Sequence, residues 1–295
     1  MAIMDQLIGI FPALVTPFTD GCVDEEKLEQ VVEKLLREGV DGLYVGGSTG
    51  EALLISLDER KEVLRRVLRQ VNGRCKVIAH IGALCTRDAV TLASDALKAG
   101  ADAISSIPPI YYGYRACELE QYYLDIVSAV KAPLLIYHVP ALSGQSLSDD
   151  NIARLFEHEN IAGIKFTAYD HFRMQRLIEK YPDKAVINGH DELYLSSLCI
   201  GSRCAVGSTF NFMAPKFMKL KESFELGDME TARRLQGEAN RIIEVMIQVG
   251  VFRAVKGIMR LQGVDAGECK RPFLPLTPEE INLLQTVLPL ANNNK

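Results

Sequence analysis

Hydrophobic positions along the chain fall into short apolar runs that alternate with longer amphipathic stretches. Runs of about four to eight residues that lack a helical period are typical of buried strands. Eight such runs are found, at residues 8–15, 43–45, 76–80, 102–106, 133–138, 162–167, 185–187 and 204–207. Helical spacing of apolar residues is clearest at Leu28, Val31, Val32 and Leu35, after the first run.

The order of these segments predicts the fold class. Strand and helix alternate eight times at a spacing of roughly 20–30 residues, and the strands are apolar on both faces, as in a parallel sheet covered by helices. This pattern predicts an α/β fold, the (β/α)8 TIM barrel. The alternative is a doubly wound open sheet, but no G-x-G-x-x-G motif follows the first strand.

Capping residues mark several of the expected helix ends. Ser and Thr followed three residues later by Glu, or Asp before an apolar run, satisfy free N–H groups, and Gly ends helices. The expected starts are at Asp24, Ser56 with Glu59, Thr86, Ser148 and the vicinity of Asp191, and the expected ends are at Gly39 and Gly100.

The alternation stops near Asp228. Ala232 to Met246 form a long amphipathic pattern ending near Gly250, a second helix is expected over 252–261, and Thr277 opens a third that leads to Val287. The sequence therefore predicts a catalytic barrel over residues 1–225 and a C-terminal three-helix extension over residues 226–295, packed on the barrel.

Composition narrows the class of protein. The formal net charge of −5 gives no sign of nucleic-acid binding. No apolar run approaches the roughly 20 residues of a membrane span, and residues 1–5 lack the basic start of a signal peptide. Seven scattered cysteines without a C-x-x-C pair indicate reduced thiols. We therefore expect a cytoplasmic protein with no membrane or nucleic-acid partner.

A lysine in the middle of the sixth strand is the central chemical feature. Side chains alternate along a strand, so Lys165 points away from the face that carries Ile164 and Phe166. No Asp or Glu lies in this strand, and a low-dielectric interior favours the neutral amine, which is a nucleophile toward carbonyl carbon. The sequence predicts a Schiff-base lysine. The alternative is a strand-end lysine that extends to water.

Reacting groups of this fold lie at the C-terminal ends of the strands. Tyr137 ends the fifth strand and would stand beside Lys165, about 4.8 Å away, if its neighbours point outward. A phenol there can relay protons, although a core tyrosine is the alternative. The stretch Gly46–Glu51 after the second strand can present several N–H groups to a carboxylate, or it is an ordinary Gly-rich turn.

The remaining strand ends supply a polar arc of four residues, namely Thr167, Asp191, Glu192 and Ser208. Adjacent acids at a helix start are either partners of the helix dipole or ligands of sugar hydroxyls. No His-rich ligand set is present, so we expect no catalytic metal. The sequence also lacks the G-x-S-x-G motif of a serine hydrolase.

Five motifs, taken in chain order, resemble the N-acetylneuraminate lyase (sialic acid aldolase) family. They are Gly46–Glu51, Tyr137 with Pro140–Gly144, Gly163–Thr167, Gly189–Glu192 and Val206–Thr209. The resemblance implies a class I aldolase on a (β/α)8 barrel, a homotetramer without a cofactor. It would cleave N-acetylneuraminate reversibly to N-acetylmannosamine and pyruvate.

The same resemblance implies roles for individual residues. Lys165 would form the Schiff base, Tyr137 would transfer protons, and Tyr111 would complete the proton relay near a subunit interface. Ser48 and Thr49 would hold the pyruvate carboxylate. The sugar chain would be held by Thr167, Gly189, Asp191, Glu192 and Ser208.

Three alternatives stay open. Dihydrodipicolinate synthase shares the lysine and tyrosine, but it typically has Thr-Thr in the Gly-rich loop and an arginine where this chain has Leu142. An apolar side chain there cannot pair with a carboxylate, which favours a neutral polyol. A 2-keto-3-deoxy sugar acid aldolase would use a shorter chain, and a non-catalytic barrel would only bind 2-oxo acids or a protein. His138 departs from a common asparagine, and it leaves the chemistry untouched if it faces outward.

Overall fold

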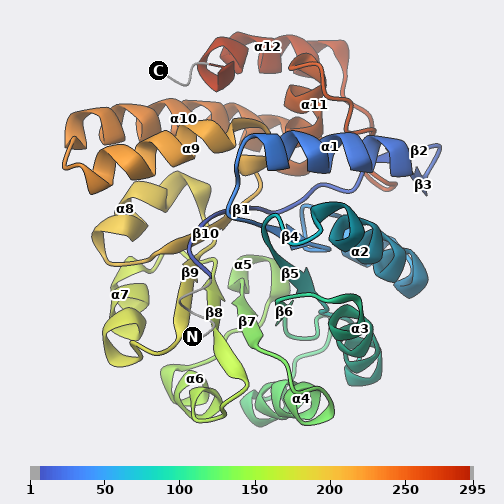
Figure 1. The fold of residues 1–295 in the computed structure, drawn as a ribbon, viewed down its shortest axis with the longest axis vertical. Helices are drawn as coiled ribbons and strands as arrows, with labels where there is room; N and C mark the ends of the chain where they lie inside the picture. The colour runs from blue at the N-terminus through green and yellow to red at the C-terminus, as the bar shows by residue number, and fades with distance from the viewer. Residues whose placement is uncertain (1–6, 293–295) are drawn as a thin grey trace.

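The computed structural model describes residues 7–292, and within them eight parallel strands form a barrel (Figure 1). In spatial order they run β1 (Gly9–Pro12), β10 (Cys204–Gly207), β9 (Ala185–Asn188), β8 (Ile161–Phe166), β7 (Leu134–His138), β6 (Ala103–Ser106), β5 (Lys76–His80) and β4 (Gly42–Val45). A parallel bridge between Ala13 and Tyr44 joins β1 to β4 and closes the ring. The predicted TIM barrel is confirmed.

Helices surround these strands and cover their outer faces (Figure 1). Those that follow the strands in turn are α1 (Glu25–Arg37), α2 (Leu57–Val71), α3 (Thr86–Ala99), α4 (Ala116–Ala129), α6 (Asp149–Phe156), α7 (His171–Lys180), α8 (Tyr194–Cys199) and α9 (Phe210–Glu225). Shorter elements are the hairpin β2 (Phe18–Thr19) and β3 (Cys22–Val23), the helix α5 (Pro140–Ser143) and the 3₁₀ turns η2 (Ala52–Leu54) and η3 (Asp191–Leu193).

Strand alternation divides the buried side chains into two layers. Ile136, Ile164 and Phe166 belong to a large cluster between strands and helices. Tyr137 and Ile187 belong to a smaller cluster inside the barrel. Because successive residues of a strand face opposite sides, the predicted outward direction of Ile164 and Phe166 is confirmed. The barrel interior is therefore a packed core of inward-facing side chains.

Most of the expected helix boundaries are confirmed. The Asp24 side chain accepts the Lys27 N–H, and Ser56 with Glu59 forms a complete capping box. The assignment of Thr86 as a cap is wrong, because Thr86 is already the first helical residue and Cys85 is the N-cap. Cys85 makes no side-chain capping bond. Hydroxyl chemistry alone therefore placed that boundary one residue too late.

Helix α9 follows the eighth strand, as the eightfold alternation requires, but its bounds were not predicted from the sequence. Its buried residues lie at nearly consecutive positions, including Phe210, Met213 and Phe217, and its backbone is kinked at Met213 before Pro215. A helix buried on most sides shows little amphipathic period, which explains why the polar pattern did not predict its bounds.

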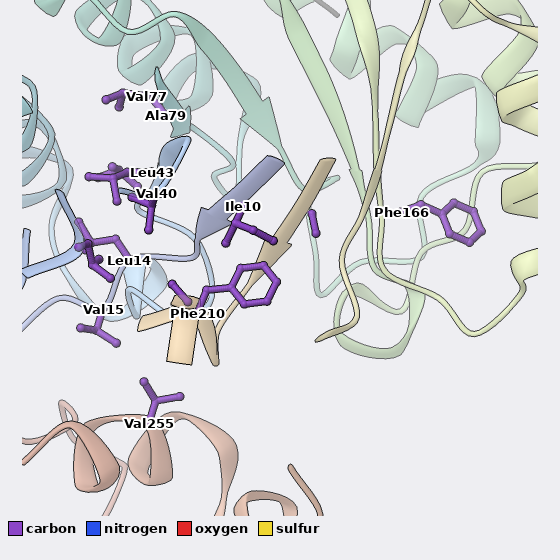
Figure 2. Close-up of a cluster of buried hydrophobic side chains, with 14 of the residues drawn as sticks. Ile10, Leu14, Val15, Val40, Leu43, Val77, Ala79, Phe166, Phe210 and Val255 are labelled. Carbon is purple, nitrogen blue, oxygen red and sulfur yellow. The ribbon is translucent and has the colours of Figure 1, made fainter. Parts of the chain in front are cut away.

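The C-terminal helices α10 (Met229–Val249), α11 (Val251–Leu261) and α12 (Pro278–Asn292) match the expected three-helix extension. Figure 1 shows α10 running beside α9, with α11 and α12 beyond it. Figure 2 shows Val255 of α11 facing Val15, in the cluster that also contains Ile10. Since barrel and extension share this core, the division into residues 1–225 and 226–295 stays a prediction.

Two further expectations concern the surroundings of the protein. No helix within residues 7–292 is long and apolar enough to cross a membrane. The expected absence of a signal peptide depends on residues 1–5, which lie outside the described residues. All seven cysteines are free thiols.

Candidate active site

Lys165 lies at the C-terminal end of β8 and points into the barrel. Its register partner on β7 is Tyr137, and only 3% of its surface is exposed, which excludes the alternative that it extends to water. The Nζ atom lies 3.7 Å from the centroid of the Tyr137 ring and donates a hydrogen bond to Thr167 Oγ1 at 3.0 Å. The predicted pairing of amine and phenol is therefore present in the fold.

Two further rings, from the adjacent strands β4 and β5, complete an aromatic group with Tyr137 beside the lysine. Tyr44 lies with its ring centroid 5.6 Å from Lys165 Nζ, and Tyr44, His80 and Tyr137 have centroids about 6 Å apart. Burial raises the pKa of Tyr44 well above its ordinary value, and its hydroxyl donates to Ser105 Oγ at 3.0 Å. Tyr44 thus stays a neutral phenol whose ring lies next to the Lys165 amine.

His80 ties this aromatic group to the Gly-rich loop, defined as residues Gly46–Glu51. Its Nε2 accepts the Ile107 N–H at 3.3 Å, so the ring proton is on Nδ1, which donates to the Gly46 carbonyl at 2.8 Å. Burial, together with the nearby Arg60 guanidinium, lowers the pKa of His80 to about 3. A permanently neutral imidazole therefore fixes the start of the loop.

The end of the loop is fixed by an ion pair with the C-terminal extension. Glu51 has φ 55°, a conformation that costs a non-glycine residue about 1–2 kcal/mol. Its Oε1 lies 2.7 Å from Lys256 Nζ of α11, and the two side chains are 1% and 3% exposed. Lys256 also donates to the carbonyls of Thr16 and Glu268. The extension therefore holds the loop in its strained shape.

Two cavities that share part of their lining lie next to this aromatic group, although neither Lys165 nor Tyr137 is among the lining residues. The smaller cavity, of about 260 Å³, is bordered by Ser48 and His80, and the larger, of about 530 Å³, by the predicted polar arc. Val139, Leu142, Phe252 and Phe273 line both. Thr49 is buried in the Gly-rich loop. Ser48 and the residues of the polar arc, which were expected to hold a carboxylate and a sugar, thus border two adjoining cavities, and Thr167 and Gly189 in the lining of the larger one lie beside Lys165.

Gly189 forms the floor of the larger cavity next to the lysine. A Cβ atom at this position would lie 1.9 Å from Thr167 Oγ1 and 3.1 Å from Lys165 Nζ. Since real side chains do not approach that closely, glycine is required here to let the amine and hydroxyl meet. The structure thus brings Lys165, Thr167 and Gly189 together, as expected.

Asp191 lies beside this floor and is buried. Its Oδ2 accepts hydrogen bonds from the Thr209 backbone N–H at 2.8 Å and the Thr209 hydroxyl at 2.6 Å. Burial outweighs these bonds and raises the pKa of Asp191 to about 6. Ser208, its neighbour across the cavity wall, also lines the larger cavity.

Glu192 is held differently, at the edge of the larger cavity. Its Oε1 accepts the Tyr169 hydroxyl at 2.9 Å and lies 3.1 Å from His190 Nδ1. Burial opposes ionisation, but hydrogen bonds from His190 and Tyr169 outweigh it and keep the pKa of Glu192 below its usual value. A charged acceptor therefore faces the cavity, which suits the hydroxyls of a sugar.

Tyr111 and His138 lie away from both cavities. Tyr111 is 89% exposed, adopts φ 85° and packs edge-on against Tyr112 at 5.0 Å. His138 stacks on Phe166 at 5.2 Å on the outer side of β7, so its expected outward direction is confirmed. Burial lowers the pKa of His138 to about 4.

Several site residues were not singled out from the sequence. Tyr44 is the residue before the last of β4, His80 is the last of β5, and both have apolar neighbours, so the rule that located Tyr137 also applies to them. The pair of Glu51 and Lys256 has no such signal, because its members are 205 residues apart. Within residues 7–292, no three His, Cys, Asp or Glu side chains are grouped to hold a metal ion.

Comparison with known proteins shows the family to which this chain belongs. A family model described as the dihydrodipicolinate synthetase family matches residues 6–290. N-acetylneuraminate lyase of Rhizobium meliloti (strain 1021) is 40% identical over 282 residues, which are 95% of this chain and 94% of the relative.

Two solved structures are similar over nearly their whole length. N-acetylneuraminate lyase from Mycoplasma synoviae (crystal form II) has a TM-score of 0.92 at 37% identity, covering 99% of this chain and 100% of that one. The Ruminococcus gnavus sialic acid aldolase catalytic lysine mutant has a TM-score of 0.95 at 28% identity, covering 99% and 97%.

Proposed function

Because the chain belongs to the dihydrodipicolinate synthetase family, we propose that it is a class I aldolase, a carbon–carbon lyase that cleaves N-acetylneuraminate reversibly to N-acetylmannosamine and pyruvate. The observation that carries the proposal is the buried amine of Lys165 against the Tyr137 ring, beside two adjoining cavities. The relatives named N-acetylneuraminate lyase support the same reaction. So does the similar structure named as a catalytic lysine mutant of a sialic acid aldolase.

The reaction begins at Lys165. Its amine attacks the C2 ketone of the open-chain substrate, and the Tyr137 hydroxyl gives its proton to the departing water, which leaves a protonated imine and a Tyr137 phenolate. Thr167 Oγ1, which accepts a hydrogen bond from Nζ at 3.0 Å, holds the amine toward the cavity. The imine then serves as the electron sink for the bond that breaks, so no cofactor is required.

Tyr137 carries out the proton transfer that follows. It removes the proton of the C4 hydroxyl, the C3–C4 bond breaks, and the electron pair moves into the imine to give an enamine and N-acetylmannosamine. Protonation of the enamine at C3 and addition of water then release pyruvate and regenerate the amine. The water lost in the first step is thereby returned.

The two cavities divide the substrate between them. Ser48 and Thr49 in the Gly-rich loop would hold the carboxylate on the side of the smaller cavity. In the larger cavity, the sugar chain would be held by Thr167, Gly189, Asp191, Glu192 and Ser208. Leu142 lines both cavities and offers no cation, and Arg253, which borders the larger cavity, is paired with Glu280, which supports a neutral polyol rather than an aldehyde with a second carboxylate.

We further propose that Tyr111 acts from a second copy of the chain, in a cytoplasmic homotetramer. An exposed tyrosine with a left-handed backbone pays a conformational cost of about 1–2 kcal/mol that nothing within its own chain explains. Sedimentation velocity measures the assembly. A mixture of Tyr111→Phe and Lys165→Met chains that is more active than either alone would establish the shared site.

Trapping of the Schiff base tests the reaction class. Incubation with pyruvate and borohydride should attach a three-carbon adduct to Lys165, found by peptide mass spectrometry, and Lys165→Met should take up none. Absence of the adduct in the unmodified chain would remove the mechanism.

A substrate panel tests the specificity. N-acetylneuraminate should be cleaved, whereas pyruvate with aspartate semialdehyde would indicate dihydrodipicolinate synthase and a shorter 2-keto-3-deoxy acid would indicate a sugar acid aldolase. Turnover of none of them would leave a non-catalytic barrel. The panel therefore separates the proposed substrate from each alternative.

A further inference from the structure

Tyr169 and His190 form a stacked pair over the carboxylate of Glu192. Their ring centroids are 4.4 Å apart with an interplanar angle of 20°. Both aim a polar atom at the same oxygen, Glu192 Oε1, at 2.9 Å from the Tyr169 hydroxyl and 3.1 Å from His190 Nδ1. The residues come from two loops, one after β8 and one after β9. Their convergence on one oxygen therefore fixes the carboxylate in a single orientation.

The backbone beneath the carboxylate is fixed from the opposite side. Gln236 Nε2 of α10 donates to the Asp191 carbonyl at 3.1 Å, and Asn240 Nδ2 donates to the Glu192 carbonyl at 3.3 Å. Both of these hydrogen bonds go to backbone carbonyls, and neither reaches the side chain of Glu192. Orientation of the carboxylate thus depends on Tyr169 and His190, whereas its position depends on α10.

A purely stabilising role does not account for the pair. Tyr169 is 69% exposed, and the His190 and Glu192 side chains are 19% and 23% exposed, at the border of the larger cavity. Partly exposed contacts of this kind contribute little to folding, because water competes for the same hydrogen bonds. The effect of the two contacts is to order the Glu192 carboxylate, an acceptor that faces the cavity.

We infer that Tyr169 and His190 are positioning residues that hold Glu192 for the hydroxyls at the far end of a long polyhydroxy substrate, and so select chain length. The inference rests on the proposed function and deepens it. Two donors on Oε1 keep the carboxylate charged and directed, and a charged acceptor binds hydroxyl donors more strongly than a neutral one. A substrate too short to reach Glu192 gains nothing from them.

Three substitutions separate the parts of the pair. His190→Phe keeps a flat ring against Tyr169 and removes the Nδ1 donor, whereas His190→Asn keeps an N–H donor near the same place and removes the ring. Tyr169→Phe removes only the hydroxyl. The matched control is His171→Asn, because His171 Nδ1 bonds Ser196 Oγ instead of Glu192 and lines neither cavity.

Steady-state kinetics with two substrates give the result. For N-acetylneuraminate, His190→Phe and Tyr169→Phe should each raise KM about tenfold, the loss of one hydrogen bond to a charged group, with kcat within about twofold. His190→Asn should restore most of the KM, and His171→Asn should leave it unchanged. With a short 2-keto-3-deoxy acid, all variants should match the unmodified chain.

Two outcomes would overturn the inference while the unmodified chain still cleaves N-acetylneuraminate. One is an unchanged KM in His190→Phe, and the other is an equal rise of KM with the short acid. Failure of the proposed function has a different signature, since the unmodified chain would then show no turnover of N-acetylneuraminate. Borohydride trapping with pyruvate tells whether the lysine chemistry persists in that case.

Discussion

The two sides of the barrel mouth are held by opposite means. On the side proposed to bind the carboxylate, here called the carboxylate side, the Gly-rich loop is anchored by Glu51 and Lys256, whose side chains are 1% and 3% exposed. On the side proposed to bind the sugar, the sugar side, Glu192 accepts from Tyr169 and lies beside His190, and the side chains of Glu192 and His190 are 23% and 19% exposed. The first arrangement is dry and rigid, and the second is in reach of water.

This difference matches what each side has to bind. Pyruvate is the same in every reaction of the proposed type, so its site gains from a fixed geometry. Hydroxyls of the sugar replace water on Glu192 at small cost, because the acceptor is already partly solvated. The comparison predicts that changes to the buried pair of Glu51 and Lys256 affect folding and every substrate, whereas changes to Tyr169 and His190 affect particular substrates.

The largest effect is expected from Lys256→Met. It leaves Glu51 buried without its cation, and loss of one partner of a buried pair costs about 3–5 kcal/mol in the free energy of unfolding. The Gly-rich loop should lose its shape with it, so that trapping with pyruvate and turnover of all substrates fall together. Chemical denaturation and borohydride labelling measure the two effects.

A surface ion pair provides the control for this experiment. Lys61 lies 3.0 Å from Asp58, whose side chain is 94% exposed, so Lys61→Met should change neither stability nor labelling. If Lys256→Met behaved like Lys61→Met, the carboxylate side would not be rigidly anchored and the comparison would fail.

Next in size is a pH effect at Asp191. Its pKa is about 6 in the folded protein against an ordinary 3.8, because burial disfavours the charged form. The folded state therefore takes up a proton first as the pH falls. The stability that this group contributes is complete below 3.8 and is lost as the pH rises through 6. The span is on the order of 2–3 kcal/mol.

Comparison with Asp191→Asn isolates this contribution. Between pH 7 and about pH 4.5, the free energy of unfolding of the unmodified chain should rise relative to the variant, since asparagine does not titrate. A difference that stays constant over this range would show that Asp191 is not buried in its charged form, and the sugar side would then be wetter than the structure indicates.

These contrasts also explain which parts of the site the sequence could predict. Alternation along β7 and β8 was sufficient to place Tyr137 and Lys165 side by side, because strand direction and register leave little freedom. The same rule applied to Tyr44 would have found the wall of the site. Local pattern decides what each strand carries inward.

Features made by distant segments had no such signal. Lys256 meets Glu51 only because α11 packs on the barrel, and Tyr169 meets His190 through two loops whose shapes no period describes. The bounds of helix α9 were not predicted because the helix is buried on most sides. Both anchoring arrangements that the comparison depends on are therefore tertiary, whereas the reacting pair between them is local.

A smaller effect is expected from Gly189→Ala, in the floor of the larger cavity beside Lys165. The added Cβ would stand 1.9 Å from Thr167 Oγ1, so the hydroxyl and the Lys165 amine must move apart. Overpacking of this kind costs about 1–3 kcal/mol. Trapping with pyruvate should slow along with the loss in stability, since the Lys165 amine that forms the adduct is displaced.

Gly237→Ala is the matched control, because its Cβ would approach nothing closer than 3.9 Å and it lies within α10. Alanine is the better helix former by about 1 kcal/mol, so this variant should be as stable as the unmodified chain or more so. Equal behaviour of the two alanine variants would mean that the floor is loosely packed.

The smallest effect is expected from Thr167→Val, which keeps the shape of the side chain and removes the acceptor 3.0 Å from Lys165 Nζ. One lost hydrogen bond is worth about 1 kcal/mol, so Schiff-base formation with pyruvate should slow about fivefold. Thr167→Ser keeps the hydroxyl and should stay within about twofold of the unmodified rate. Because the amine reacts with every substrate, valine should slow long and short substrates by the same factor. If the rate fell only with N-acetylneuraminate and not with the short acid, Thr167 would act on the sugar alone and would have no part in holding the Lys165 amine.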